Sequence, residues 1–383
     1  MKYKVSIIIP VFNVENYLFK ALDSIISQSL GFENIEVILI DDNSTDNSAK
    51  IMERYESKHD NIKCIYCKKG SGFAGKPRNI GLKNSTSDYI MFLDSDDYLE
   101  KNSCKILYET ITEENADIIS GSYATKNIKG KYEFNEKPWI LTLTSPQMDK
   151  ELRIEKTHEL LSNPDFKLIV TDLNDYEEII GNPNVWGKIF KKSLIEDNNI
   201  EFPEDIVAQD SVFLLESFFN ENKIVFIKDI IVYHDNRRNQ KNDKSISFVK
   251  SKKNLYGRIK AYDLMHDISK QYSREELFYK YLLIQKLLHW YKNYLLETDV
   301  SRDELENIFR KYSHLFTKGY ESTIRMPKSI KQVFKEISNN NYDDAIKIFL
   351  KSKQNYHQKR QKPNPSKKPN PPLFNKIKTF LKS

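Results

Sequence analysis

Three aspartates follow an apolar segment of the sequence at very short spacing. Asp94, Asp96 and Asp97 come directly after the apolar residues 90–93. Carboxylates this close repel one another unless a cation neutralises them, and Mg²⁺ and Mn²⁺ prefer oxygen ligands. The spacing therefore predicts a divalent-metal site with Asp96 as a ligand, and Asp97 as the cap of a helix over 97–110.

A second candidate site is the glycine-rich loop at 70–79, which contains Arg78. Glycines allow backbone N–H groups to approach a phosphate, and a guanidinium binds phosphate oxygens in pairs. A flexible turn is the alternative, but it does not explain the basic residues inside the loop. Asp42 ends another apolar segment, 35–42, and is followed by residues typical of a helix cap.

Asp210 immediately precedes an apolar segment of helical spacing, so it is either a helix cap or a general base. Glu204 and Asp205 lie nearby in the sequence and are rivals for the role of base.

A basic stretch follows the apolar segment 223–235 and contains Arg237 and Arg238. It is either a solvent-exposed loop or a contact for a diphosphate. His234, at the end of the same segment, is a second candidate metal ligand.

The hydrophobic pattern predicts the elements that position these side chains. Short β-branched runs alternate with amphipathic segments: strands at 5–12, 35–42, 62–67 and 88–97, and helices at 14–30, 47–59 and 77–85. This alternation predicts an α/β fold with an open, mainly parallel sheet flanked by helices. Ligands bind beyond the carboxyl ends of such strands, so the polar residues there should meet at one edge.

The rest of the chain predicts further regions. Residues 125–180 are polar and read as an elaboration at the edge of the sheet, and sheet character resumes over 185–235. We therefore expect a catalytic domain over 1–250 and a helical accessory domain over 251–352. Residues 353–383 are rich in lysine and proline and are expected to form a linker with a short amphipathic tail.

The charge distribution and the cysteine content indicate the cellular compartment of the protein. Residues 351–383 contain ten Lys/Arg and no acid, whereas the other 350 residues hold 50 basic and 54 acidic side chains. Three cysteines indicate a reducing compartment, and no segment has the roughly 18 apolar residues of a membrane span. We expect a cytoplasmic protein at the inner face of the membrane, with the basic tail contacting anionic lipid.

Taken together, the motifs resemble glycosyltransferase family 2, enzymes of the GT-A fold that use nucleotide-diphosphate sugars. The resemblance covers roughly residues 3–247 and rests on "VSIIIPVFNVENYL", "EVILIDDNSTDNS", "GKPRNIGL", "YIMFLDSDDYL", "WGKIFKKSLIE" and "FPEDIVAQD". The chain looks closest to the branch that adds β-N-acetylglucosamine to wall teichoic acid, and related capsule and exopolysaccharide transferases share much of the pattern.

The resemblance implies roles for individual residues. Pro10, Val11 and Asn13 would line the base and ribose, and Asp42 would contact the uracil. Arg78 would bind the diphosphate with Arg237 or Arg238, Asp94 the ribose, Asp96 the Mn²⁺ or Mg²⁺, and Asp210 would be the catalytic base. Gly70 replaces the usual Asn, which removes an expected uracil contact, and Gln209 replaces the usual Glu before the base.

The implied reaction is metal-dependent transfer of a hexose from a UDP-sugar, such as UDP-GlcNAc, with inversion at the anomeric carbon. The acceptor would be a hydroxyl of a polymeric or lipid-linked glycan or polyol. A sugar-nucleotide pyrophosphorylase is a weaker alternative. Such enzymes usually carry a glycine-rich loop just after the first strand, whereas this chain has Val-Phe-Asn-Val at 11–14. A non-catalytic module that binds an anionic polymer through the basic tail is another alternative. Nucleic-acid binding is not expected, since no aromatic residues are interleaved with the basic ones, and assembly into oligomers stays open.

Overall fold

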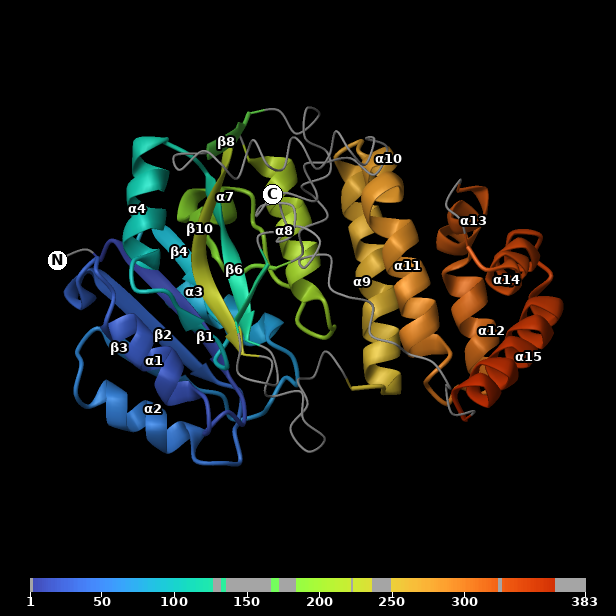
Figure 1. Cartoon of the computed structure of the whole chain (residues 1–383), viewed down its shortest axis with the longest axis horizontal. Helices are drawn as coiled ribbons and strands as arrows, with labels where there is room; N and C mark the ends of the chain where they lie inside the picture. Colours follow the sequence, from blue (N-terminus) through green and yellow to red (C-terminus); the bar gives the residue numbers. More distant parts are fainter. Residues whose placement is uncertain are drawn as a thin grey trace, which may run out of the picture. The chain divides into compact units, whose positions relative to one another are not determined.

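The protein is described here by a computed structural model that covers residues 3–126, 132–135, 167–171, 184–221, 223–235, 249–322 and 326–361 (Figure 1). The chain divides into two compact units, Met1–Asp299 and Val300–Ser383. The predicted boundary at residue 250 therefore falls inside the first unit, because the helices after it pack with the sheet domain.

The first half of the sheet is built as the sequence pattern predicts. Its elements alternate in the order β1 (Val5–Val11), α1 (Leu18–Ile26), β2 (Ile35–Asp41), α2 (Ser48–Glu56), β3 (Ile62–Tyr66), α3 (Gly75–Asn84) and β4 (Tyr89–Phe92). The strands pair in parallel in the spatial order β3-β2-β1-β4. Each helix returns the chain to the same end of the sheet, so the carboxyl ends of these strands share one edge.

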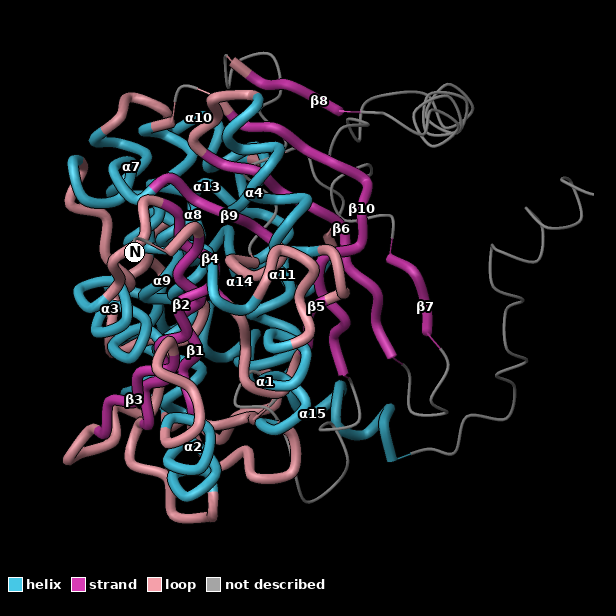
Figure 2. Tube along the Cα trace, turned by 90° about the vertical axis from the view of Figure 1, so that its left-hand side faces the viewer, coloured by secondary structure: helices cyan, strands magenta, loops and turns pink. Residues whose placement is uncertain are grey.

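The second half of the sheet is mixed rather than parallel. It contains β5 (Tyr98–Leu99), α4 (Ser103–Glu113), β6 (Ile118–Lys126), β7 (Tyr132–Asn135), β8 (Lys167–Val170), β9 (Lys188–Lys191), α7 (Lys192–Asp197), α8 (Gln209–Asn220) and β10 (Ile224–Asp235). The spatial order continues β4-β9-β6-β10-β5, with β9 antiparallel to both of its neighbours (Figure 2). The predicted mainly parallel sheet is therefore confirmed in its first half and modified in its second.

Nearly every residue of the central strands β1 and β2 is buried, whichever side of the sheet it points to. Both faces of the sheet are therefore covered. One face packs Ile7, Ile9 and Leu39 against α1, α2 and α4. On the other face, Gly81 of α3 lies against Ile8 and Ile40, and Phe92 and Phe190 contact Phe213 of α8. Helix α8 is thereby fixed against the carboxyl end of β4.

The helix predicted over 97–110 begins later than expected. Residues Tyr98–Leu99 form β5, which pairs with β10, and α4 starts only at Ser103. Asp97 is therefore not the cap of this helix, and its side chain is buried with 1% exposure. Tertiary pairing of β5 with β10 overrides the local helical tendency of this segment.

Helices form the remainder of both units. The first unit ends with α9 (Lys252–Gln271), α10 (Glu275–Leu277), a π-helical segment (Phe278–Leu283), α11 (Ile284–Trp290) and a second π-helical segment (Tyr291–Leu295). The second unit contains α12 (Arg302–Lys311), α13 (Ser313–Glu321), α14 (Lys328–Ser338) and α15 (Tyr342–Gln361). Helix α15 runs past residue 353, where the linker was expected to begin. None of the described helices combines the length and hydropathy that a bilayer crossing requires.

Candidate active site

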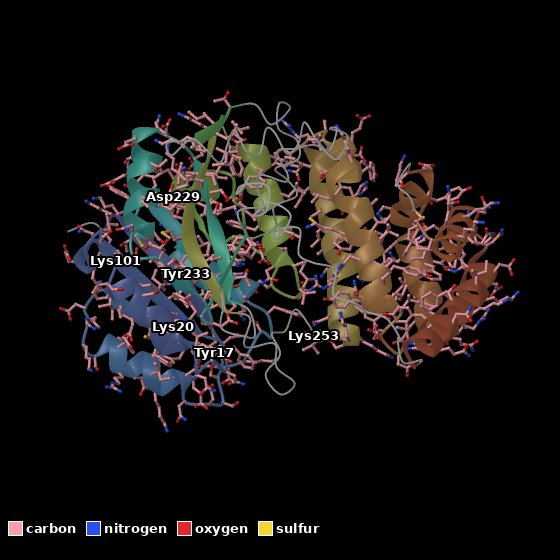
Figure 3. The ribbon with its side chains drawn as sticks, viewed as in Figure 1. Tyr17, Lys20, Lys101, Asp229, Tyr233 and Lys253 are labelled. Atoms are coloured by element: carbon pink, nitrogen blue, oxygen red, sulfur yellow. The ribbon has the colours of Figure 1, made fainter. Side chains whose placement is uncertain are left out.

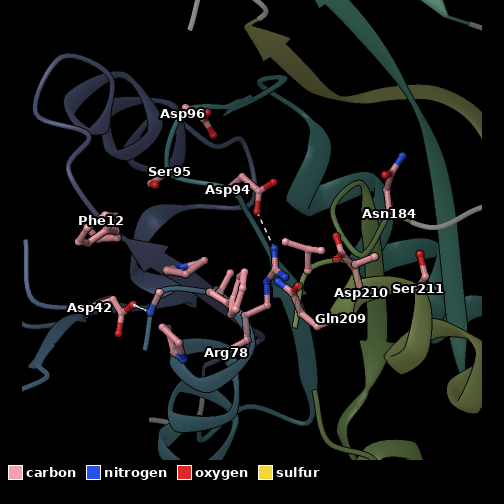
Figure 4. Close-up of a pocket in the computed structure, with 18 of the residues that line it drawn as sticks. Phe12, Asp42, Arg78, Asp94, Ser95, Asp96, Asn184, Gln209, Asp210 and Ser211 are labelled. Atoms are coloured by element: carbon pink, nitrogen blue, oxygen red, sulfur yellow. Dashed lines mark hydrogen bonds and ion pairs between the residues drawn. The ribbon is translucent and has the colours of Figure 1, made fainter. Parts of the chain in front are cut away.

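A cavity of about 310 Å³ lies at the carboxyl ends of β1, β2 and β4. The loops after these strands meet there with the first turns of α3 and α8 (Figure 4). Arg258 of α9 also lines the cavity. The polar residues that line it are Asp42, Arg78, Asp94, Ser95, Asp96, Asn184, Gln209, Asp210, Ser211 and Arg258. The predicted convergence of Pro10, Val11, Asp42, Arg78, Asp94, Asp96 and Asp210 is thus present in the structure.

Asp42 ties the glycine-rich loop to the end of β2. Its carboxylate accepts hydrogen bonds from the backbone N–H and the hydroxyl of Ser71, at 2.8 and 2.9 Å, and from the N–H of Gly72 at 3.0 Å. Gly72 has a φ of +78°, a conformation that few residues other than glycine adopt easily. The loop is held from its other side by Lys253 of α9, whose ammonium lies 4.0 Å from the centre of the Phe73 ring (Figure 3).

Arg78 is a buried cation at the floor of the cavity. Its side chain is 3% exposed, and one terminal nitrogen lies 2.7 Å from Oδ1 of Asp94. The guanidinium carbon is 5.3 Å from the centre of the Phe202 ring. Nε and Nη1 have no hydrogen-bond partner among the described residues. Because buried charged donors are costly when unpaired, this arrangement suits an anion that enters the cavity.

Asp94, Asp96 and Asp97 form the acidic cluster that their spacing predicts. Each can offer a carboxylate oxygen within 4.8 Å of the others. The backbone N–H of Asp97 donates to the carbonyl of Asp94 at 3.0 Å, which closes a tight turn. Three hard oxygen donors at this spacing fit Mg²⁺ or Mn²⁺, so Asp97 joins the cluster instead of capping a helix.

The turn that carries this cluster is held in place by aromatic contacts. Tyr98 stacks on Tyr233 of β10 with ring centres 5.0 Å apart, and the ammonium of Lys20 in α1 lies 3.4 Å from the centre of the Tyr98 ring. Lys20 and Tyr233 are labelled in Figure 3. These contacts anchor β5 between α1 and β10, which fixes the position of the carboxylates that precede it.

Asp210 lies in the first turn of α8, directly after an unusual backbone conformation. Ala208, the residue before the helix, has φ +62° and ψ +26°, a left-handed conformation that is unfavourable for alanine. Burial raises the pKa of the Asp210 carboxyl, and the charge of Asp94 raises it further. Arg78 and Lys286 of α11 act in the opposite direction, and so does a hydrogen bond from the helix backbone. A carboxyl with a raised pKa is a suitable proton acceptor when it remains ionised.

The two rivals for the role of base lie outside the cavity lining. Asp205 pairs with Lys260 at 2.7 Å, and this hydrogen bond lowers the pKa of its carboxyl. Glu204 is exposed and accepts a hydrogen bond from Asn79 at 3.3 Å. Of the three candidates for the role of base, Asp210 alone lines the cavity.

Asn13 is the predicted nucleotide-binding residue that the structure places away from the cavity lining. Its side-chain oxygen accepts a hydrogen bond from the backbone N–H of Thr45 at 2.8 Å, so it braces the loop after β2. The side chain of His234 and residues Arg237 and Arg238 lie outside the described part of the chain.

The structure adds residues that the sequence did not indicate. Arg258 of α9 lines the cavity, although it follows Arg78 by 180 positions and belongs to no recognisable motif. Burial lowers the pKa of Lys188 in β9 to about 7 and that of Lys286 to about 8, and Asp210 raises both. A signal existed for Lys188, since a lysine beside the apolar run Ile189–Phe190 is unusual in a buried strand.

Comparison with known proteins agrees with this arrangement. Residues 6–172 match the family model for glycosyl transferase family 2. A poly(ribitol-phosphate) beta-glucosyltransferase of Bacillus spizizenii is 32% identical over 271 residues, which are 68% of this chain and 37% of the relative. The poly(ribitol-phosphate) beta-N-acetylglucosaminyltransferase TarS of Staphylococcus aureus is 30% identical over 236 residues, 61% of this chain and 36% of TarS. The chain thus spans little more than a third of the length of these relatives.

A solved structure shares the fold. The crystal structure of S. aureus TarS 1–349 in complex with UDP has a TM-score of 0.66 and 21% sequence identity, and the match covers 93% of this chain and 92% of that chain. The predicted GT-A fold is confirmed by this likeness. The family match at residues 6–172 shows that this part of the chain is a glycosyltransferase family 2 domain.

Proposed function

We propose that this chain is a metal-dependent, inverting glycosyltransferase that moves a hexose from a UDP-sugar to a hydroxyl of a cell-surface polymer. The relatives act, by their names, on poly(ribitol phosphate), with glucose in one case and N-acetylglucosamine in the other. TarS 1–349 has also been solved in complex with UDP-GlcNAc. A teichoic-acid-like polyol phosphate is therefore the acceptor class that we favour, and UDP-GlcNAc or UDP-glucose the donor.

The observation that carries the proposal is the Arg78 guanidinium in the cavity. It is buried and held by Asp94, and two of its nitrogens have no partner among the described residues. A diphosphate offers the oxygens that such a group binds best. When the sugar leaves, negative charge grows on that diphosphate, and a fixed cation stabilises it.

The cluster beside Arg78 fits a divalent ion and the nucleotide. Asp96 and Asp97 would hold Mn²⁺ or Mg²⁺, while Asp94, paired with Arg78, would contact the ribose. A bound ion would neutralise part of the diphosphate charge. Pro10, Val11 and Asp42 would surround the base and ribose at the ends of β1 and β2.

Asp210 is our candidate for the catalytic base. It would accept the proton of the acceptor hydroxyl as the new bond to the anomeric carbon forms and the bond to the diphosphate breaks. One displacement with one base inverts the anomeric carbon, so an α-linked sugar nucleotide gives a β-glycoside. The raised pKa of the Asp210 carboxyl favours this proton transfer.

The experiment compares the wild-type protein with Asp210→Asn and with Asp205→Asn as a matched control. UDP release from UDP-GlcNAc and UDP-glucose is followed with Mn²⁺ and poly(ribitol phosphate). We expect Asp210→Asn to bind UDP normally in calorimetry and to lose transfer by roughly 10²- to 10⁴-fold. Asp205→Asn should stay active, because that carboxylate pairs with Lys260 away from the cavity lining. Full turnover by Asp210→Asn would disprove its role as the base.

The basic tail supports a further part of the proposal, a peripheral contact with the membrane. Residues 351–383 carry ten positive charges without an acid. Each basic residue near an anionic surface contributes about 1 kcal/mol of attraction. We therefore propose that the tail holds the enzyme at the inner face of the membrane, where a lipid-linked or polymeric acceptor is assembled.

A further inference from the structure

The short motif Trp186-Gly187-Lys188 at the start of β9 takes no direct part in the proposed reaction. Trp186 packs edge-on against Tyr123 of β6 with ring centres 4.7 Å apart. Gly187 has a φ of +71°, and its carbonyl accepts a hydrogen bond from Gly121 at 2.9 Å. This turn brings Lys188 into the sheet, where the residue is only 2% exposed.

The register of β9 shows which way the Lys188 side chain points. Ile189 packs in the core under α1 and α4, so Lys188 and Phe190 project to the opposite face. Phe190 contacts Phe213 of α8, with ring centres 5.8 Å apart. Asp210 is three residues before Phe213, which places both on one side of α8. Lys188 precedes Phe190 by one pleat and therefore points toward the turn that carries Asp210.

The ammonium of Lys188 has one hydrogen bond to a described residue. Its Nζ donates to the backbone carbonyl of Asn184 at 2.6 Å, and Asn184 lines the cavity together with Asp210 (Figure 4). Ser120, opposite Lys188 on β6, is fully buried, and its hydroxyl has no partner among the described residues. A buried ammonium with so few partners is costly, and an anion nearby offsets that cost.

We propose that Lys188 is a positioning residue of the candidate base: its buried ammonium keeps the Asp210 carboxylate ionised and holds the Asn184 carbonyl in the cavity wall. The inference rests on the proposed function of Asp210. Lys188 does not itself line the cavity, so it would act on the base from behind the cavity wall. The turn at Trp186-Gly187 would place it there.

The other charged groups around Asp210 act on its pKa in opposite directions, so the ammonium of Lys188 has an effect to add. Asp94 opposes ionisation of Asp210, and Arg78, which favours it, is paired with Asp94. Lys286 of α11 also favours ionisation, but Arg258 of α9 lowers the pKa of that lysine. Burial lowers the pKa of Lys188 to about 7, and the Asp210 carboxylate works against that fall. An ammonium close to a carboxylate favours the ionised form of that carboxylate, and this is the effect that we infer for Lys188 on Asp210.

The test uses Lys188→Met, which removes the charge, and Lys188→Arg, which keeps it. The pH dependence of kcat/KM for the donor is measured for both variants and for Lys191→Met, a control at the partly exposed end of the same strand. We expect the acidic limb to move to higher pH by about one unit in Lys188→Met and to return toward the wild-type position in Lys188→Arg. UDP affinity should not change. A uniform loss of kcat at every pH in Lys188→Met, with no shift of the limb, would overturn the inference.

A second measurement does not require activity. The protein is labelled with ¹³C-lysine, and the ε-methylene signal of Lys188 is assigned by its loss in Lys188→Met. This signal should titrate near pH 7. In Asp210→Asn its midpoint should fall, because the carboxylate that favours the ammonium is gone. An unchanged midpoint would refute the coupling between the two residues. Failure of the proposed function would instead appear as a wild-type protein that neither binds UDP nor releases it from a UDP-sugar.

Discussion

Replacing Arg78 by lysine separates the charge of this residue from its geometry. Arg78 is 3% exposed, one terminal nitrogen bonds to Asp94, and Nε and Nη1 have no partner among the described residues. A lysine keeps the positive charge but has a single nitrogen, so it cannot hold Asp94 and bind two diphosphate oxygens in the same geometry. We expect Arg78→Lys to bind UDP more weakly than the wild type while remaining folded.

The size of the effect follows from the hydrogen bonds that are lost. A hydrogen bond to a charged group contributes about 1.5–3 kcal/mol, and a factor of ten in affinity corresponds to about 1.4 kcal/mol. Loss of one such bond to the diphosphate should weaken UDP binding by roughly 10- to 150-fold. Uridine has no phosphate, so its affinity should change little.

Calorimetric titration of UDP and uridine at constant Mn²⁺ measures both affinities. Lys76→Met is the matched control, because Lys76 lies two residues before Arg78 on α3 but is exposed and does not line the cavity. Its loss should alter UDP binding by less than about threefold, since exposed charges are well screened. If Arg78→Lys binds UDP as tightly as the wild type, or if uridine binding falls in parallel, the assignment of Arg78 to the diphosphate is wrong.

Three other perturbations test separate parts of the structure. Asp96→Ala should make UDP binding independent of Mn²⁺ in calorimetry, and a persistent Mn²⁺ requirement would argue against Asp96 as a ligand. Ala208→Gly should raise the free energy of unfolding, measured by urea denaturation, by up to about 1 kcal/mol, because glycine adopts the left-handed conformation without strain. A lower free energy of unfolding would show that the backbone at Ala208 is not strained. Removing residues 362–383 should preserve UDP release but reduce sedimentation with anionic lipid vesicles, whereas unchanged sedimentation would exclude residues 362–383 as the membrane contact.

The elements that alternate regularly were predictable from the sequence. The strands β1, β2, β3 and β4 and the helices between them occur in the expected order, because buried parallel strands read as continuous apolar runs. The parallel connection also explains why the sequence alone could place Asp42, Arg78 and Asp94 at one edge of the sheet. For β5 the local pattern was misleading, since its pairing with β10 depends on residues more than 130 positions later.

The contribution of the later helices to the site could not be read from the sequence. Arg258 lies on α9, which also presents Lys253 to the glycine-rich loop, and neither residue belongs to a local pattern. A helical region over 251–352 was predicted, but a helical pattern says only which face of a helix is buried and not against which element that helix packs. For the same reason the domain boundary was expected at residue 250, whereas the compact unit extends to Asp299.

The sequence by itself determined the acidic cluster, the glycine-rich loop and the order of strands that brings them together, since these depend on local spacing and on the handedness of parallel connections. Only the tertiary structure decided the environment of Asp210: its partial burial in the cavity wall, the left-handed residue before it, and the lysines of β9 and α11 whose pKa values its charge affects. The strength of a base depends on the charges and solvent around it in space, and these come from segments that are far apart along the chain.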